Sequence, residues 1–158
     1  MSPGTRIAAM PRILLAVRIL GYFLFVGAFF LPAVRTVAAP GTGAPDSYQG
    51  SFCAWITLLN TLNAQTWHSK DFLAILSGWI NPLMILYVAF LFSRKLRYAR
   101  RVIAGLVILY MAGTWVYFYL TPLVPLIGHV LWILGILMIL APETVSARQA
   151  PQAAVPDR

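Results

Sequence analysis

Ser93–Arg101, Ser-Arg-Lys-Leu-Arg-Tyr-Ala-Arg-Arg, is the stretch that decides the fold of this chain, because it holds five cations and no acid in nine residues. Segment 72–92 precedes it, segment 102–120 follows it, and neither contains a charged residue. Each segment is about as long as the roughly 20 residues that a helix needs to cross the hydrocarbon core of a membrane. A short basic loop between two such segments is typical of a helical hairpin whose turn stays on the cytoplasmic side.

The composition also favours a membrane protein. The chain has 158 residues, of which 60% are hydrophobic and 10% are charged, and its mean hydropathy is +0.79. Soluble domains carry about 25% charged residues. The net charge of +8 does not indicate nucleic-acid binding, because the cations lie at the ends of apolar segments and not on a folded polar surface. The single cysteine, Cys53, excludes an intrachain disulfide and a multi-cysteine metal site.

We therefore predict an all-α, polytopic fold with four transmembrane helices and one extracytoplasmic interfacial helix. The transmembrane domain is expected to cover residues 1–142, with spans at about 13–34, 72–92, 102–120 and 123–141. The first span has an alternative, a cleaved signal peptide, because a basic leader precedes it and small residues follow it. Pro142 is expected to end the last helix, and residues 143–158 are expected to form a disordered cytoplasmic tail.

The extracytoplasmic loop is predicted to be 35–71. Its first part, 38–50, is rich in Pro, Gly and Ala and should be irregular. The second part, 51–65, shows helical periodicity: one face is apolar (Phe52, Trp55, Ile56, Leu59, Leu62) and the other is more polar (Cys53, Thr57, Asn60, Ala64). An amphipathic helix too short to span a membrane is expected to lie in the interface.

The distribution of charge predicts the orientation. Ten cations fall on the side of the basic loop, and only Arg35 and Lys70 fall on the other side. Such asymmetry is typical of the cytoplasmic side, so both termini should be cytoplasmic and the chain should lie in the inner (plasma) membrane. The cations of the loop are candidate ligands for anionic lipid head groups (Arg94, Lys95, Arg97, Arg100, Arg101).

No catalytic motif is present. The chain has no phosphate-binding Gly-Lys-Ser/Thr loop, no dinucleotide-binding glycine turn and no His-Glu-x-x-His zinc helix. None of the predicted spans contains a carboxylate, which disfavours ion-coupled transport. We expect no enzymatic activity and no cofactor.

The two histidines are the only candidates for a cofactor or metal. His68 and His129 are both predicted at the outer end of the spans, where Asp71 and Cys53 could join them. Imidazole is a common ligand of haem and transition metals. The alternative is that each histidine forms hydrogen bonds at the interface, and that Asp71 caps the helix that follows it.

Three polar residues lie inside the predicted spans. Asn81, Tyr110 and Thr114 could line a polar path, or could form hydrogen bonds between helices. Pro82 follows Asn81 and is expected to kink its helix.

Small residues recur seven apart in three spans: Gly21 and Ala28, Gly105 and Ala112, Gly128 and Gly135. Small side chains let helices approach closely, so these pairs are predicted to mark the faces that pack inward.

The chain resembles a group of small four-helix bacterial inner-membrane proteins. The resemblance covers the last three spans and rests on Trp79-Ile80-Asn81-Pro82-Leu83, the basic loop and His129-Val130-Leu131-Trp132. It implies the four-helix fold and no particular activity.

The function predicted from these observations is that of an accessory or structural subunit. Its expected partners are membrane lipid and the helices of a larger complex or of a second copy, not nucleic acid. Two alternatives stay open: a small transporter or channel using Asn81, Tyr110 and Thr114, and a haem- or metal-binding redox protein using His68 and His129.

Overall fold

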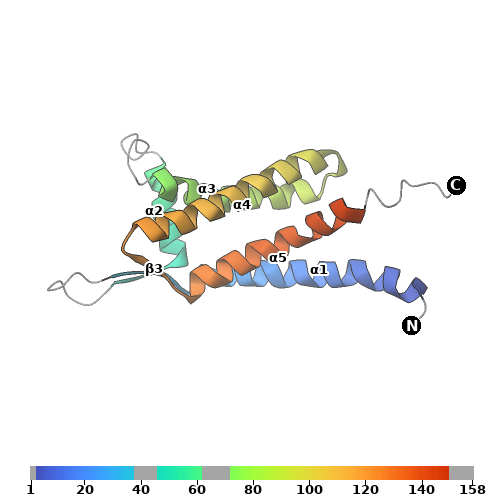
Figure 1. The fold of residues 1–158 in the computed structure, drawn as a ribbon, viewed down its shortest axis with the longest axis horizontal. Coiled ribbons are helices and arrows are strands. Elements are labelled where there is room, and N and C mark those ends of the chain that lie inside the picture. The colour runs from blue at the N-terminus through green and yellow to red at the C-terminus, as the bar shows by residue number, and fades with distance from the viewer. Residues whose placement is uncertain (1–2, 38–45, 62–71, 150–158) are drawn as a thin grey trace.

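A computed structural model describes residues 3–37, 46–61 and 72–149 (Figure 1). These residues form α-helices, one short 3₁₀ helix and three short strands. The elements in chain order are α1 (Pro3–Ala28), β1 (Pro32–Thr36), β2 (Ser47–Gln49), α2 (Gly50–Asn60), α3 (Phe72–Leu91), η2 (Arg94–Leu96), α4 (Arg97–Leu120), β3 (Leu123–Pro125) and α5 (Ile127–Gln149). The mainly helical fold that the sequence predicts is confirmed.

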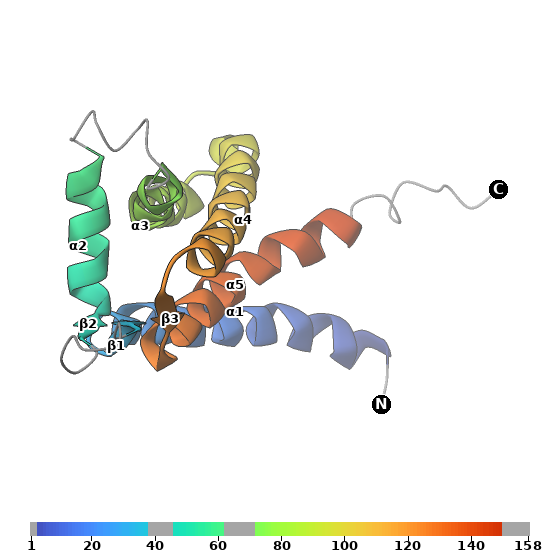
Figure 2. The same cartoon turned by 60° about the vertical axis from the view of Figure 1, so that its left-hand side comes forward.

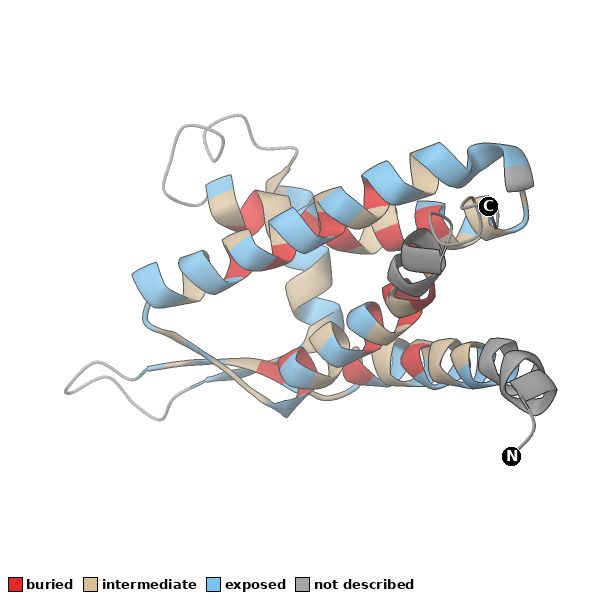
Figure 3. Cartoon of the chain, turned by 45° about the vertical axis from the view of Figure 1, so that its right-hand side comes forward, coloured by how far each residue is buried: buried red, intermediate tan, exposed pale blue. Residues whose placement is uncertain are grey.

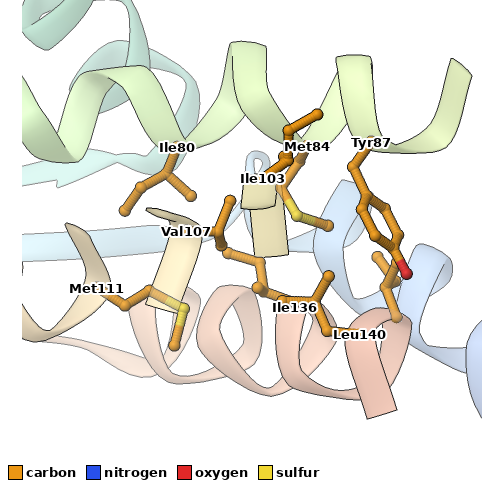
Figure 4. Close-up of a cluster of buried hydrophobic side chains, with 9 residues drawn as sticks. Ile80, Met84, Tyr87, Ile103, Val107, Met111, Ile136 and Leu140 are labelled. Atoms are coloured by element: carbon orange, nitrogen blue, oxygen red, sulfur yellow. The ribbon is translucent and has the colours of Figure 1, made fainter. Parts of the chain in front are cut away.

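The four long helices form two pairs: α1 packs along α5, and α3 packs along α4 (Figure 1). A cluster of buried apolar side chains from α3, α4 and α5 joins the pairs (Figure 4). Ile80, Val107 and Ile136 are among its fully buried members. Exposed residues cover the outer faces of the helices (Figure 3).

Glycines allow α1 and α5 to approach closely. A Cβ atom at Gly135 would lie 2.6 Å from the backbone nitrogen of Phe25 and 2.8 Å from the carbonyl oxygen of Gly21. The small-residue pattern therefore marks the packed faces of these two helices. It is wrong for α4, where Gly105 and Ala112 are exposed and a Cβ atom at Gly105 would meet nothing within 4 Å.

A three-stranded antiparallel sheet closes one end of the bundle, with β1 between β2 and β3. Val34 pairs with Tyr48 on one side and with Pro125 on the other. The sequence did not indicate this sheet, because each strand is short and 47–49 lies in a segment expected to be irregular. The sheet ties together the end of α1, the start of α2 and the connection from α4 to α5.

The sheet changes the ends of two helices. The helix predicted for 13–34 ends at Ala28, because Pro32 disfavours a helical conformation of the residue before it and β1 begins there. The helix predicted from 123 begins at Ile127, since Leu123–Pro125 pairs with β1.

The expectation that Pro142 ends the last helix is wrong. α5 continues through Pro142 to Gln149, so residues 143–149 are helical. Proline removes one backbone hydrogen bond from a helix interior. The next residue, Glu143, contacts Arg18 and Arg100.

Helix α2 lies across the long helices at the sheet end of the bundle (Figure 2). It crosses α3 where Gly78 has no side chain, and a Cβ atom there would lie 2.9 Å from the carbonyl oxygen of Thr57. Trp55 and Leu59 point outward and are exposed, whereas Thr57 lies against α3. The part of the apolar face of α2 that carries Trp55 and Leu59 therefore points away from the protein, the reverse of the arrangement in a soluble domain.

Two helices, α3 and α4, are long and apolar enough to cross a membrane, and α5 has a shorter apolar stretch, Ile127–Glu143. The N-terminal end of α1, the C-terminal end of α5 and η2 lie at one end of the bundle, and the sheet and α2 lie at the other (Figure 1). The described part of the chain thus has one basic end and one sheet end.

Candidate functional site

A cavity of about 280 Å³ lies next to the sheet, between α2, α3, α4 and α5. Its walls are mainly apolar and aromatic, with a few polar side chains among them (Cys53, Thr57, Asn60, Ser77, Asn81, Thr114, His129). None of the described residues that line it is Asp, Glu, Lys or Arg. A concave, mostly apolar site with a few convergent polar groups is the usual form of a small-molecule site.

His129 is the most unusual polar residue of the lining. It is only 7% exposed, and its ring contacts three aromatic rings. The ring centroids lie 4.8 Å from Phe118, 5.4 Å from Trp132 and 6.0 Å from Trp115. Its Nε2 atom is buried and has no hydrogen-bond partner in the described structure. Buried polar atoms are nearly always paired, so this imidazole needs an explanation.

Asn81 is the second polar group, and it is held by α5. The indole Nε1 of Trp132 donates a hydrogen bond of 3.0 Å to the Asn81 Oδ1 atom. This bond occupies one of the two lone pairs of the carboxamide oxygen. The NH₂ group of Asn81 can only donate.

Three hydroxyl groups of the lining donate to their own helices. Thr57 Oγ1 lies 2.8 Å from the carbonyl oxygen of Cys53, Ser77 Oγ lies 2.7 Å from that of Ala74, and Thr114 Oγ1 lies 2.9 Å from that of Tyr110. Such bonds satisfy these hydroxyl protons within the helix. His129 and Asn81 are polar residues of the lining that can still offer a donor to a molecule in the cavity.

The polar residues predicted inside the spans are only partly brought together. Asn81 and Thr114 both line the cavity, and Thr114 is buried. Tyr110 packs instead against the buried cluster of Figure 4. In that figure Met84 and Tyr87 follow Ile80 along α3, and the Tyr87 hydroxyl is a buried polar group among these mostly apolar side chains.

His68 and Asp71 were predicted to lie near His129. Both residues are outside the described part of the structure. Within 3–37, 46–61 and 72–149, no three His, Cys, Asp or Glu side chains come close enough to hold a metal ion.

Cys53 also lines the cavity, from α2. Partial burial raises the pKa of its thiol above the ordinary value, since burial disfavours the thiolate.

The basic loop divides into inward and outward cations. Lys95, Arg97 and Arg101 are exposed, as head-group ligands would be. Arg100 turns inward, and one of its terminal nitrogens lies 3.6 Å from Glu143 Oε1. The side chain of Arg94 is outside the described part of the structure.

No protein-family model, curated protein or solved structure matches this chain. We therefore infer the candidate site from the positions and contacts of its residues. The sequence prediction omitted Trp132, Ser77 and the aromatic neighbours of His129. Two spacings could have indicated them: Ser77 and Asn81 are four apart, and His129 and Trp132 are three apart, so each pair shares a helix face.

Proposed function

We propose that this chain is a multi-pass membrane protein that binds a small, mainly apolar molecule in the cavity beside the sheet. The buried and unpartnered imidazole of His129 carries this proposal. Leaving a polar group buried without a partner costs about 1–3 kcal/mol. A bound molecule with a matching polar atom removes that cost, and the cavity next to His129 has room for one.

The exterior of the molecule supports the membrane part of the proposal. Large apolar side chains are exposed along the long helices, including Phe23 at 73% and Ile85 at 70%. Soluble proteins rarely expose apolar surface on this scale. We place α1, α3, α4 and α5 across the inner (plasma) membrane, with η2 and both termini on the cytoplasmic side, because that end carries the cations.

Binding in the cavity agrees better with the geometry than the other predicted functions. A transport path would need a series of polar side chains beyond Asn81, where mostly apolar residues of the buried cluster lie. A metal site would need further ligands beside His129, and no three His, Cys, Asp or Glu side chains come together among the described residues. An accessory role beside a larger complex, or beside a second copy, stays a prediction, and so does the binding of lipid head groups by the exposed cations.

The proposal is tested by filling the cavity. Ser77→Leu adds a larger side chain at a lining position without removing a bond between elements. We expect neutral one- and two-ring molecules to raise the melting temperature of the wild-type protein in detergent by several degrees, since binding to the folded state at about 100 times Kd stabilises it by about 2.7 kcal/mol. Ser77→Leu should abolish the increase.

Ala112→Leu is the matched control, because it adds the same side chain on the exposed face of α4. It should respond as the wild type does, which also controls for partition of the probes into detergent. Equal responses of Ser77→Leu and the wild type would contradict binding in this cavity.

A further inference from the structure

We infer that the cavity selects a neutral, planar ring that carries a carbonyl oxygen, such as a quinone head group. This inference rests on the proposed binding function and adds the chemical class of the ligand. Three features of the described residues carry it: the polarity of the donors, the absence of charge in the lining and the shape of the aromatic wall.

The available side-chain groups are mainly donors. Asn81 uses its Oδ1 to accept from Trp132 and keeps an NH₂ group. His129 lacks a partner at Nε2, and in the tautomer that carries its proton there this atom donates. A ligand that accepts hydrogen bonds satisfies both residues, and a carbonyl oxygen has two lone pairs with which to accept them.

A neutral ligand suits this lining, because no charged side chain lies among the described lining residues. An ion in such surroundings would lose its hydration without gaining a counter-charge. The described lining therefore disfavours phosphates, carboxylates and amines as ligands.

The wall of the cavity favours a flat ring. Trp132 and Phe118 both line the cavity, and their rings differ in orientation about His129, with interplanar angles of 32° and 85° to the imidazole. Aromatic rings prefer offset-stacked and edge-to-face contacts, and this wall can offer both. An apolar cavity of about 150 Å³ is sufficient for benzene, so the cavity here, with about 280 Å³, accommodates a substituted ring.

The approach to the cavity favours a lipid-soluble molecule. Phe52 and Ile56 line the cavity, yet they are 49% and 40% exposed. The rim formed by α2 therefore presents apolar side chains to the outside as well as to the cavity. A ligand that dissolves in the membrane can reach the cavity across such a rim.

The test compares duroquinone, a tetramethylated benzoquinone, with durene, a tetramethylbenzene that has no oxygen. Duroquinone has no unsubstituted ring carbon to which the Cys53 thiol could add. The dissociation constant of each probe is measured on the full-length protein in detergent, for the wild type, His129→Phe and Asn81→Leu. We expect duroquinone to bind the wild type about tenfold more tightly than durene, the effect of one or two hydrogen bonds.

The variants should remove this preference. Duroquinone should bind His129→Phe and Asn81→Leu about tenfold more weakly than the wild type, while durene binding should not change and so shows that each variant keeps its cavity. Equal affinity for both probes, or a preference that survives in both variants, overturns the carbonyl class and leaves the proposed cavity site intact. If Ser77→Leu binds every ring probe as the wild type does, the proposed function fails and this inference fails with it.

Discussion

At the scale of single residues, Glu143 holds three helices together at the basic end. Its Oε1 lies 3.9 Å from a terminal nitrogen of Arg18 on α1 and 3.6 Å from one of Arg100 on α4. Arg18 Nε also donates to the carbonyl oxygen of Ile139 at 3.3 Å. All three charged side chains are largely buried, so one carboxylate compensates two cations with little help from solvent.

Glu143→Gln is expected to lower the free energy of unfolding. It keeps the size of the side chain but leaves the charges of Arg18 and Arg100 uncompensated. Breaking a buried pair costs about 3–5 kcal/mol, and the long distances here reduce the expected loss to about 1–3 kcal/mol. Thermal melting in detergent measures the loss. Lys95→Gln, at an exposed cation, should change stability by less than about 0.5 kcal/mol. Equal melting temperatures for both variants would show that Glu143 contributes nothing.

At the scale of elements, the crossing of α1 and α5 depends on backbone contact. Gly21 and Gly135 face each other so closely that neither position has space for a side chain. Van der Waals packing between helices is a main source of stability in membrane proteins, where the hydrophobic effect does not drive helices together. The contact therefore sets the distance between the two helices that carry Arg18 and His129.

Gly135→Ala should destabilise the protein. Its methyl group would lie within 2.6–2.9 Å of backbone atoms of Gly21 and Phe25, so the helices must separate. Overpacking typically costs about 1–3 kcal/mol. Gly105→Ala is the control, because nothing lies within 4 Å of the added atom. That variant should be stabilised by up to about 1 kcal/mol through helix propensity. A melting temperature for Gly135→Ala at or above that of Gly105→Ala would contradict the close crossing.

At the scale of the whole molecule, the two ends differ in chemistry. One end collects η2, the start of α1 and the end of α5, and the other holds the sheet, α2 and the cavity (Figure 1). The proposed orientation places the sheet end outside the cytoplasm. Cys53, on α2, and Lys95, on η2, lie at opposite ends and can report on it.

A membrane-impermeant maleimide should label Cys53 in sealed right-side-out vesicles. A cysteine introduced by Lys95→Cys, with Cys53→Ser, should be labelled only after permeabilisation. The thiolate is the reactive form, and burial raises the pKa of Cys53. Labelling of Cys53 should therefore keep accelerating above pH about 8.5, where an unperturbed thiol such as that of Lys95→Cys begins to level off. Labelling of Lys95→Cys in sealed vesicles would reverse the orientation.

Hydropathy and periodicity alone predict where most helices lie and which face of α2 is apolar. The segment predicted as 72–92 is α3, Phe72–Leu91, and the segment 102–120 lies within α4, Arg97–Leu120. The periodicity of 51–65 correctly separated Trp55 and Leu59 from Thr57. Hydropathy and periodicity depend on residues that are neighbours in the chain, so they can be determined without knowledge of the packing.

Only the tertiary structure decided the sheet, the ion pairs and the candidate site. Val34 pairs with Pro125, Arg18 meets Glu143, and Trp132 bonds to Asn81, although the partners are far apart in the sequence. The aromatic rings that contact His129 likewise belong to α4 as well as to its own helix. Such contacts depend on which helix faces meet, and here the close approach of α1 to α5 and of α2 to α3 decides them. A local sequence pattern does not specify which helix faces make contact. Small residues recur seven apart at Gly135, which packs closely, and also at Gly105, which is exposed.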